Sequence, residues 1–382
     1  MQKPVIFLST CEFSGDIYGE ILINEIRKRV PEVSFYGVGG AKMAGAGMEL
    51  LFDTTSRSTL GFTEALKNLR VMKRLISDIV SEWEKRRPDL VLWLDSGGFN
   101  LPLALEAKKR GIPVVCMFSP SAWAYGQDRA VKLAARVKLL MAVLPFEADF
   151  YRRFGTNVIY VGHPLIDRVK SECEPHQYRR GLGVNPDQKL VALMPGSRKQ
   201  EINRLLPPML DAARIIEQEM SVKWVLPVAG SINRDWLESL LQKYPVRPRI
   251  ITRGAYDLLA AADGAIISSG TATLEAAILN TPMVVIYRIS KLSYFIYKRM
   301  ESPEHKGKPV VVGLPNLILG RKVIPEVLQE DLTPANIANE LRSILIDSRR
   351  TETMRRELLE VKNLIGPEGV MERAADLIVS LL

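Results

Sequence analysis

Short apolar runs alternate with amphipathic segments along most of the chain. Val5–Ser9 and Leu90–Leu94 are continuous and apolar, as strands buried on both faces of a parallel sheet are. Further strands are predicted at Val33–Tyr36, Val114–Phe118, Val137–Val143 and Val158–Val161. Helical spacing instead marks the segments near Asp16–Arg29, Leu66–Lys85 and Leu103–Arg110. This alternation predicts an α/β domain whose parallel strands are joined by right-handed crossovers.

The same pattern starts again after Gly162-His163-Pro164 and a polar stretch. Its predicted strands are Val191–Met194, Trp224–Pro227, Ile250–Thr252, Gly264–Ser268 and Met283–Tyr287. We therefore predict an α/β fold of two Rossmann-like, doubly wound domains facing a cleft, at residues 1–165 and 166–365. The remaining segment, 366–382, has the spacing of a helix that we expect to return to the first domain. Ligands of such domains bind beyond the carboxyl ends of the strands.

Composition narrows the class of partner. The 382 residues suit two domains, and 47% hydrophobic with 25% charged residues is typical of a soluble globular protein. The net charge of +9 favours nucleic acid, a phosphorylated substrate or an acidic lipid surface. Cys11, Cys116 and Cys173 form neither a zinc nor a disulfide pattern, which favours the cytoplasm. No run approaches the ~18 apolar residues of a membrane span, so we expect a soluble or peripheral protein.

One turn after a predicted strand has the composition of an anion site. In Met194-Pro195-Gly196-Ser197-Arg198, Gly196 allows a tight turn, and Ser197 is expected to cap a helix opening at Arg198. Free N–H groups at that helix start, together with the Arg198 guanidinium, would bind phosphate oxygens. The alternative is an ordinary strand–turn–helix junction with a surface arginine.

A second turn of this kind follows the strand Gly264–Ser268. It is rich in glycine and small hydroxyl residues, which let a pyrophosphate approach the backbone at a helix start: Ser269, Gly270, Thr271 and Thr273. Glu275, one turn into the helix, can accept from two ribose hydroxyls. The alternative is a well-capped helix in which Glu275 only complements the helix dipole.

Together the two turns resemble the donor-binding half of GT-B glycosyltransferases. Almost from end to end, the chain is similar to the lipid-A-disaccharide synthase family. The segments that carry the resemblance, besides the two turns, are Glu12–Asp16, Gly37–Met43, Gly61–Glu64, Asp95 with Phe99-Asn100, Ser119–Ala124, Leu144–Glu147, Gly162–Pro164, Leu314–Leu317 and Pro325–Gln329.

The resemblance implies an inverting hexosyltransferase. It would condense UDP-2,3-diacylglucosamine with 2,3-diacylglucosamine 1-phosphate (lipid X), giving the β-1,6 lipid A disaccharide 1-phosphate and UDP. No cofactor is implied, and no Asp-x-Asp metal motif occurs. Arg198 and the two turns would therefore stabilise the negative charge of the leaving diphosphate. Matching positions add Asn316 and Gln329 as donor contacts. The implied setting is the cytoplasmic face of the inner membrane, with an anionic surface, no nucleic acid and a homodimer left open.

The resemblance also assigns the base. Asp95 follows the strand Leu90–Leu94 and matches the family's acidic residue, so we predict that it takes the proton from the acceptor 6-hydroxyl. Glu12 and Asp16 are predicted as catalytic or orienting groups. The alternatives are that Asp95 caps a turn, and that Glu12 and Asp16 are an ordinary first-turn acid and a helix cap.

The chain departs from the family pattern near these acids. Ser96-Gly97-Gly98 stands where the family has x-Pro-Asp after its first acid, and Cys11 and Phe13 stand where Gly and Ala are usual. These changes put acceptor choice and acyl-chain preference in doubt.

One segment has the pattern of an interfacial helix. Its apolar residues share one face and are flanked by Lys67, Arg70 and Arg74: Leu66, Leu69, Met72 and Ile76. Such a face equally suits packing against the helix's own domain. Tyr287–Met300 is a second candidate for membrane contact.

Three other functions compete with this interpretation. A nicotinamide-dependent oxidoreductase is disfavoured, because the first turn lacks Gly-x-Gly-x-x-Gly. A GT-B-fold UDP-sugar 2-epimerase would use the same donor turns, and a catalytically impaired nucleotide-sugar-binding relative would explain Gly98. His163, in Gly-His-Pro, is interpreted as a hinge contact rather than a base.

Overall fold

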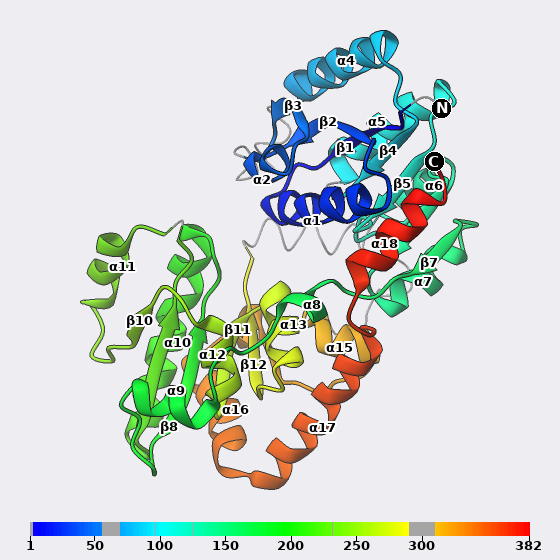
Figure 1. Cartoon of the computed structure of the whole chain (residues 1–382). Coiled ribbons are helices and arrows are strands. Elements are labelled where there is room, and N and C mark those ends of the chain that lie inside the picture. The colour runs from blue at the N-terminus through cyan, green and yellow to red at the C-terminus, as the bar shows by residue number, and fades with distance from the viewer. Residues whose placement is uncertain (1–2, 56–68, 96, 125, 231, 290–309) are drawn as a thin grey trace. The chain divides into compact units, whose positions relative to one another are not determined.

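The computed structural model describes residues 3–55, 69–95, 97–124, 126–230, 232–289 and 310–382 (Figure 1). These fall into two compact units, residues 3–164 with 366–382, and residues 165–289 with 310–365. Each unit is built on one parallel sheet, which confirms the predicted α/β fold.

The first unit contains a seven-stranded sheet in the order β3-β2-β1-β4-β5-β6-β7. Its strands are β1 (Val5–Ser9), β2 (Ser34–Gly39), β3 (Glu49–Asp53), β4 (Leu90–Trp93), β5 (Val114–Met117), β6 (Leu139–Ala142) and β7 (Val158–Tyr160). The central strands are buried because almost every side chain in them is apolar, as Leu90 to Trp93 illustrate.

Helices of the first unit connect these strands and cover the sheet. They are α1 (Phe13–Arg29), α2 (Ala41–Gly45), α4 (Leu69–Lys85), α5 (Gly97–Lys109), α6 (Asp128–Ala134), α7 (Pro145–Arg152) and α18 (Val370–Val379). The last helix, red in Figure 1, packs beside α1, blue, although the two are separated by most of the chain. Arg29 joins them through an ion pair with Asp376 at 2.5 Å.

The second unit contains a six-stranded sheet in the order β10-β9-β8-β11-β12-β13. Its strands are β8 (Lys189–Met194), β9 (Val222–Pro227), β10 (Arg249–Ile251), β11 (Gly264–Ser268), β12 (Met283–Tyr287) and β13 (Glu326–Leu328). The helical elements are α8 (Leu165–Arg168), α9 (Pro175–Gly181), α10 (Lys199–Glu217), α11 (Arg234–Leu241), α12 (Ala255–Ala261), α13 (Thr271–Ile278), α15 (Leu314–Leu319), η1 (Gln329–Asp331), α16 (Pro334–Ile346) and α17 (Ser348–Leu364).

In both sheets the strand order reverses at one place. The reversal lies between β1 and β4 in the first sheet and between β8 and β11 in the second. Open α/β sheets bind ligands at such a switch point, beyond the carboxyl ends of the strands. The topology therefore selects the segments after β1, β4, β8 and β11 as candidate sites.

Several predicted boundaries were wrong. Helix α1 begins at Phe13 rather than Asp16, and α5 begins at Gly97 rather than Leu103. Strands β3 and β13 were not predicted, and both are outermost in their sheets. An outermost strand has a neighbour on one side only and is less buried, so its sequence need not be continuously apolar.

Candidate active site

Asp95 lies where β4 ends, directly beside the end of β1. Ser9 pairs with Trp93 across these strands, so the segment after β1 runs next to Asp95. The Asp95 carboxyl group is 6% exposed and accepts from the Thr10 hydroxyl, the Cys11 N–H at 2.8 Å and the Glu12 N–H at 2.9 Å. These donors lie in the segment between β1 and α1 and hold the carboxyl group in one orientation.

The pKa of Asp95 is raised to about 7. Burial is the main cause, while the donors from Thr10 and Cys11 act in the opposite direction. The negative charge of Glu12 raises the pKa further. A carboxyl group with this pKa can accept a proton near neutral pH, which suits general-base catalysis.

The turn around Asp95 has little room. The Trp93 indole N–H and the Asn100 amide donate to the Asp95 carbonyl, and the Ser9 hydroxyl donates to Asn100 Oδ1 at 2.5 Å. A Cβ atom on Gly15 would collide with the Asp95 carboxylate, so only glycine fits there. We did not predict the parts of Thr10, Gly15 and Asn100 in this arrangement from local spacing, because their contacts are made across the sheet.

Glu12 and Asp16 occupy different environments. Glu12 is exposed at the N-cap of α1, and its carboxylate does not cap that helix. Asp16 is buried and accepts from the N–H groups of Gly40 (3.0 Å), Lys42 (3.1 Å) and Met43 (3.1 Å) at the start of α2. Its lone pairs are thereby used within the fold, which favours an orienting role for Asp16 rather than proton transfer.

The two glycines after Asp95 differ in surroundings. A Cβ atom on Gly97 would lie 2.6 Å from Pro120 Cγ, so a larger residue there would displace the segment after β5. A Cβ atom on Gly98 would meet nothing within 4 Å. The family's acid could therefore be accommodated at position 98, whereas a bulkier residue at position 97 could not without movement.

The first predicted donor turn follows β8, at the other switch point. Gly196 has a φ of +112°, a conformation that glycine tolerates. The predicted helix cap was wrong: α10 begins at Lys199 with Arg198 as its N-cap. The carboxylate of Glu201 accepts from the N–H groups of Ser197 at 3.1 Å and Arg198 at 3.3 Å, and pairs with the Arg198 guanidinium at 3.1 Å.

The Arg198 and Glu201 contacts form a capping box at the start of α10. Glu201 supplies a carboxylate to the same backbone N–H groups that a phosphate would use. The Arg198 side chain is 69% exposed, so its remaining donors face solvent.

The second donor turn lies beside the first, because Met194 of β8 pairs with Ile267 of β11. Gly270 has a φ of +146° and precedes α13, and Thr271 is exposed at the start of that helix. The Ser269 hydroxyl donates to the Val312 carbonyl at 2.8 Å. The Thr273 hydroxyl donates to the Gly270 carbonyl, also at 2.8 Å, so these two side chains shape the turn itself.

Glu275 is half-buried on α13. Burial raises its pKa, and the Tyr256 hydroxyl, which donates to Glu275 at 3.2 Å, lowers it together with the charge of Arg168. The Glu275 carboxylate is therefore held through one oxygen on the helix that follows β11.

Asn316 lies in α15, before β13, and Gln329 directly follows β13. The Asn316 side chain is buried, donates to Ile324 O and Glu326 Oε1, and accepts from the N–H groups of Val323 and Ile324, at 2.7–3.0 Å. Gln329 has a φ of +48°, and its carbonyl accepts from Arg288 at 2.9 and 3.1 Å. Asn316 thus orders its own segment, and Arg288 is a positively charged residue of this edge that we did not predict.

Part of the predicted interfacial helix is described. Leu66 lies outside the described residues, and Leu69 begins α4. Met72 and Ile76 are half-buried against the core of the first unit. This part of the apolar face therefore packs on its own domain. The second membrane candidate, Tyr287–Met300, lies largely outside the described residues.

His163 is buried, and burial lowers its pKa to about 4. The imidazole is therefore neutral near pH 7. Its ring lies edge-on to Phe118, with 6.5 Å between centroids. These surroundings fit a packing role better than proton transfer.

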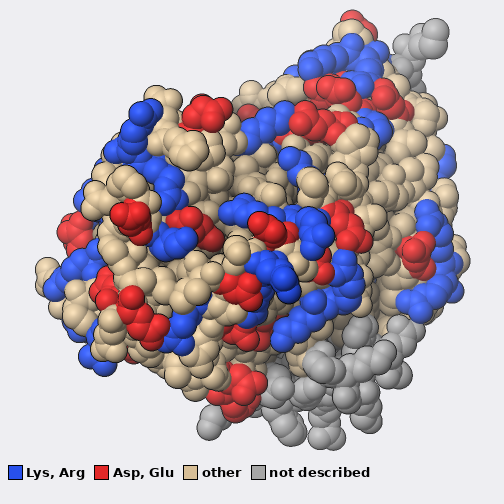
Figure 2. All heavy atoms as spheres, turned by 90° about the horizontal axis from the view of Figure 1, so that it is seen from below, with Lys and Arg blue, Asp and Glu red and all other residues tan. Residues whose placement is uncertain are grey.

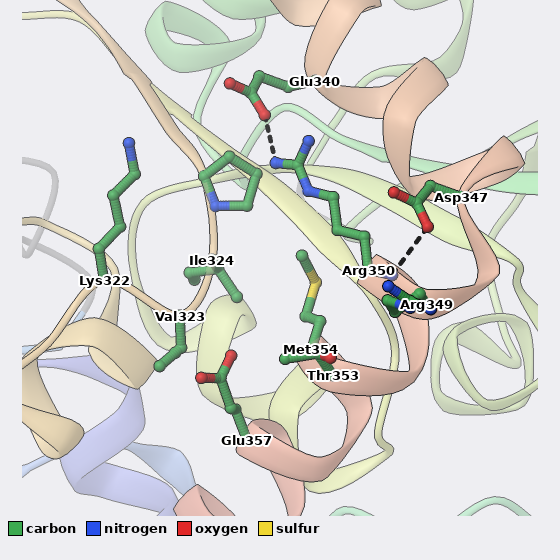
Figure 3. A pocket seen from close by; sticks show the side chains of 11 residues that line it. Lys322, Val323, Ile324, Glu340, Asp347, Arg349, Arg350, Thr353, Met354 and Glu357 are labelled. Carbon is green, nitrogen blue, oxygen red and sulfur yellow. Dashed lines mark hydrogen bonds and ion pairs between the residues drawn. The ribbon is translucent and has the colours of Figure 1, made fainter.

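A separate pocket lies at the opposite end of the second sheet (Figure 3). It has a volume of about 510 Å³ and lies between the segment before β13 and the start of α17, with Met354 and Arg350 among its lining residues. Parallel strands place their amino ends at this edge, so the pocket is not part of the candidate donor site.

Two solved structures share the fold of this chain. The chain resembles a glycotransferase of kitacinnamycin (TM-score 0.66, 16% identity, 100% of both chains covered). It also resembles a UDP-GlcNAc 2-epimerase from Neisseria meningitidis bound to UDP-GlcNAc (TM-score 0.63, 16% identity, 99% of both chains covered). At such identities the likeness is one of fold, and that fold is GT-B.

Sequence comparison is more specific. The family model for lipid-A-disaccharide synthetase matches residues 6–377. Lipid-A-disaccharide synthases from Syntrophus aciditrophicus and Myxococcus xanthus are 38% and 36% identical, covering 100% and 99% of this chain and 99% and 98% of theirs. The chain therefore belongs to the lipid-A-disaccharide synthase family and is a glycosyltransferase. The 2-epimerases are related to it only distantly, through the fold.

Proposed function

We propose that this protein condenses UDP-2,3-diacylglucosamine with lipid X, with inversion, giving the β-1,6-linked lipid A disaccharide 1-phosphate and UDP. The family supports this reaction, since the full-length relatives are lipid-A-disaccharide synthases. Inversion requires a single in-line displacement, with one base on the acceptor hydroxyl and stabilisation of the departing diphosphate.

The observation that carries the proposal is the state of Asp95. It ends a strand at the switch point of the first sheet, is held by three donors, and has a pKa of about 7. In this proposal Asp95 accepts the proton of the acceptor 6-hydroxyl as that oxygen attacks the anomeric carbon. Glu12, exposed beside it, contacts the acceptor, and Asp16 orients the first turn through α2.

The donor half of the reaction is assigned to the second unit. The diphosphate lies against the N–H groups of the turn Gly196–Arg198 and of the turn Ser269–Thr273, displacing the Glu201 carboxylate from the first. The Arg198 guanidinium stabilises the charge that develops on UDP. Glu275 binds the ribose, and Asn316 and Gln329 support the segments around it.

We further propose that the protein is peripheral on the cytoplasmic face of the inner membrane. Both substrates carry acyl chains, and the net charge of +9 favours an anionic surface. On the face drawn in Figure 2, acidic side chains lie among the basic ones, so the surplus does not form one uniform patch there. Among the described residues, no helix is long and apolar enough to cross a bilayer. Sedimentation with anionic and neutral vesicles would test the membrane contact, and light scattering would test for a homodimer.

The reaction is tested by measuring UDP release with donor alone and with donor plus lipid X, in the presence and absence of EDTA. We expect UDP release only with the acceptor, no effect of EDTA, and a disaccharide product. An epimerase would interconvert the donor sugar without lipid X. A binding protein that has lost activity would retain UDP affinity and release none.

A further inference from the structure

The segment that follows β5 lies against the turn that carries Asp95. Phe118 has a φ of +61°, unusual for a bulky residue, and its ring stacks on Tyr18 of α1 with 4.8 Å between centroids. Pro120 abuts Gly97, two residues from Asp95, so closely that a Cβ atom on Gly97 would lie 2.6 Å from its ring. The position of this segment, residues 118–123, therefore limits where the Asp95 turn can lie.

Glu147 of α7 lies beneath the same segment. Its side chain is 4% exposed, and the side chains of Trp123 and Ser119 lie close enough to favour its ionised form. Even so, Glu147 Oε2, Trp123 Nε1 and Ser119 Oγ are all buried without a hydrogen-bond partner. Three polar atoms from two elements thus converge in the interior with hydrogen bonds unmade.

Such a cluster is costly for a fold that needs only packing. Burying a carboxyl group with an unpaired oxygen destabilises the protein, and an apolar side chain of similar size would avoid that cost. Trp123 also packs edge-on against Phe146, with 5.0 Å between centroids, so apolar contacts already hold the segment on α7. The polar atoms call for a role other than packing.

The fully buried thiol of Cys116, at the end of β5, connects this cluster to Asp95. Its pKa is raised mainly by burial, and also by the charges of Glu147 and Asp95. Both carboxyl groups therefore interact electrostatically with one side chain. Strand β5, which carries Cys116, lies between β4, which Asp95 follows, and β6, which precedes α7.

We propose that Glu147 is a positioning residue for sugar transfer, which holds residues 118–123 against the Asp95 turn through Ser119 and Trp123. The inference rests on the proposed function, in which Asp95 is the base. Glu147 itself touches no reacting atom. Its carboxyl group lies beside Ser119 and Trp123, on either side of Pro120 in the chain, and the Tyr151 hydroxyl of the same helix donates to the Pro120 carbonyl. Pro120 in turn limits the place of Gly97 and hence of the Asp95 turn.

The test compares Glu147→Leu, which removes the polar atoms, with Glu147→Gln, which keeps them without the charge. We expect Glu147→Leu to lower kcat by about 10²-fold, the effect of a misplacement of about 1 Å in an active site, with the UDP dissociation constant unchanged. Glu147→Gln should restore kcat to within a few-fold of wild type. Asp149→Asn is the matched control, because Asp149 is an acid on the same helix with its side chain 82% exposed.

Hydrogen exchange supplies a readout that needs no substrate. Glu147→Leu should exchange faster at residues 97–103 and 118–124, and at the wild-type rate at residues 189–194 of the second unit. If Glu147→Leu does not fold, Ser119→Ala and Trp123→Phe each remove one polar atom and must lower kcat with UDP affinity retained.

Normal kcat in folded Glu147→Leu, or in both Ser119→Ala and Trp123→Phe, would overturn the inference, as would unchanged exchange at residues 97–103. Absence of acceptor-dependent UDP release in the wild type would instead overturn the proposed function. Hydrogen exchange would in that case still test whether Glu147 positions residues 97–103.

Discussion

At Asp95, two influences on one carboxyl group oppose each other. Burial favours the protonated form, and the donors from Thr10, Cys11 and Glu12 favour the ionised form. The resulting pKa of about 7 keeps both forms populated near neutral pH. A base must be ionised to accept a proton, so the sign of the pH dependence follows directly.

We predict that kcat/KM rises with pH through about 7 and falls roughly tenfold for each unit below it. A pH–rate profile at constant ionic strength measures this limb. Glu147 has a pKa of about 7 as well, so Glu147→Gln is the necessary control and should leave the limb in place. A flat profile between pH 5 and 8 would be incompatible with Asp95 as the base.

The glycine pair after Asp95 gives a second prediction. Gly98→Asp should retain activity and fold stability, because its Cβ has open space and an acid suits the first turn of α5. Gly97→Ala should lower the free energy of unfolding by about 1–3 kcal/mol and reduce kcat, since Pro120 must move. Thermal melts and UDP-release assays measure the stability and activity of both variants, with Gly98→Ala as the control. Equal stability and activity of Gly97→Ala and Gly98→Ala would refute the prediction.

Arg198 gives a prediction in the second unit. Arg198→Ala removes a charge-assisted donor worth roughly 1.5–3 kcal/mol, which corresponds to about 10- to 100-fold in UDP affinity. Calorimetry with UDP measures this loss of affinity. Arg234→Ala is a suitable control, because its exposed side chain pairs only with Glu238 among the described contacts. Unchanged UDP affinity and turnover in Arg198→Ala would remove Arg198 from the site.

At the scale of elements, the central strands were predictable because they are continuous apolar runs. Strand β3, Glu49-Leu50-Leu51-Phe52-Asp53, has polar ends and partly exposed side chains, so its pattern was too weak to register. The start of α5 was missed because Gly97 and Gly98 have poor intrinsic helix propensity, and tertiary contacts set its boundary. The composition of the glycine-rich turns predicts donor sites, and this stays a prediction. The pairing of Glu201 with the N–H groups of Ser197 and Arg198 was not predicted, although it is local.

Helix α18 carries a prediction at this scale. Arg373 donates to three backbone carbonyls, those of Val161 (3.0 Å), Pro367 (2.7 Å) and Glu368 (2.6 Å), and so fastens the helix start to the end of β7. Arg373→Ala should lower the free energy of unfolding by about 1–2 kcal/mol, since charged donors to three backbone carbonyls, two of them at exposed positions, are lost. Chemical denaturation measures this, and Arg356→Ala, whose only described bond is to Thr353, should be near neutral. Equal stability of the two variants would mean that Arg373 does not anchor α18.

At the scale of the whole molecule, both candidate sites lie where the strand order reverses. Asp95 lies at the switch point of the first sheet, and the two donor turns lie at that of the second. The alternation of strands and helices predicted the fold class, and motif resemblance along the chain predicted the family. Neither could predict the buried contacts of Asp95, because Thr10 and Asp95 are 85 residues apart in the sequence.

The proposed function assigns proton transfer to one unit and donor binding to the other, and one variant can therefore test the central claim. Asp95→Asn keeps the shape of the side chain and deletes the base. Its acceptor-dependent UDP release should fall by about 10²–10⁴-fold, while its UDP dissociation constant stays that of the wild type. Near-normal turnover in Asp95→Asn would contradict the account and make Glu12 the next residue to test, and loss of UDP binding together with turnover would show a damaged fold instead of a missing base.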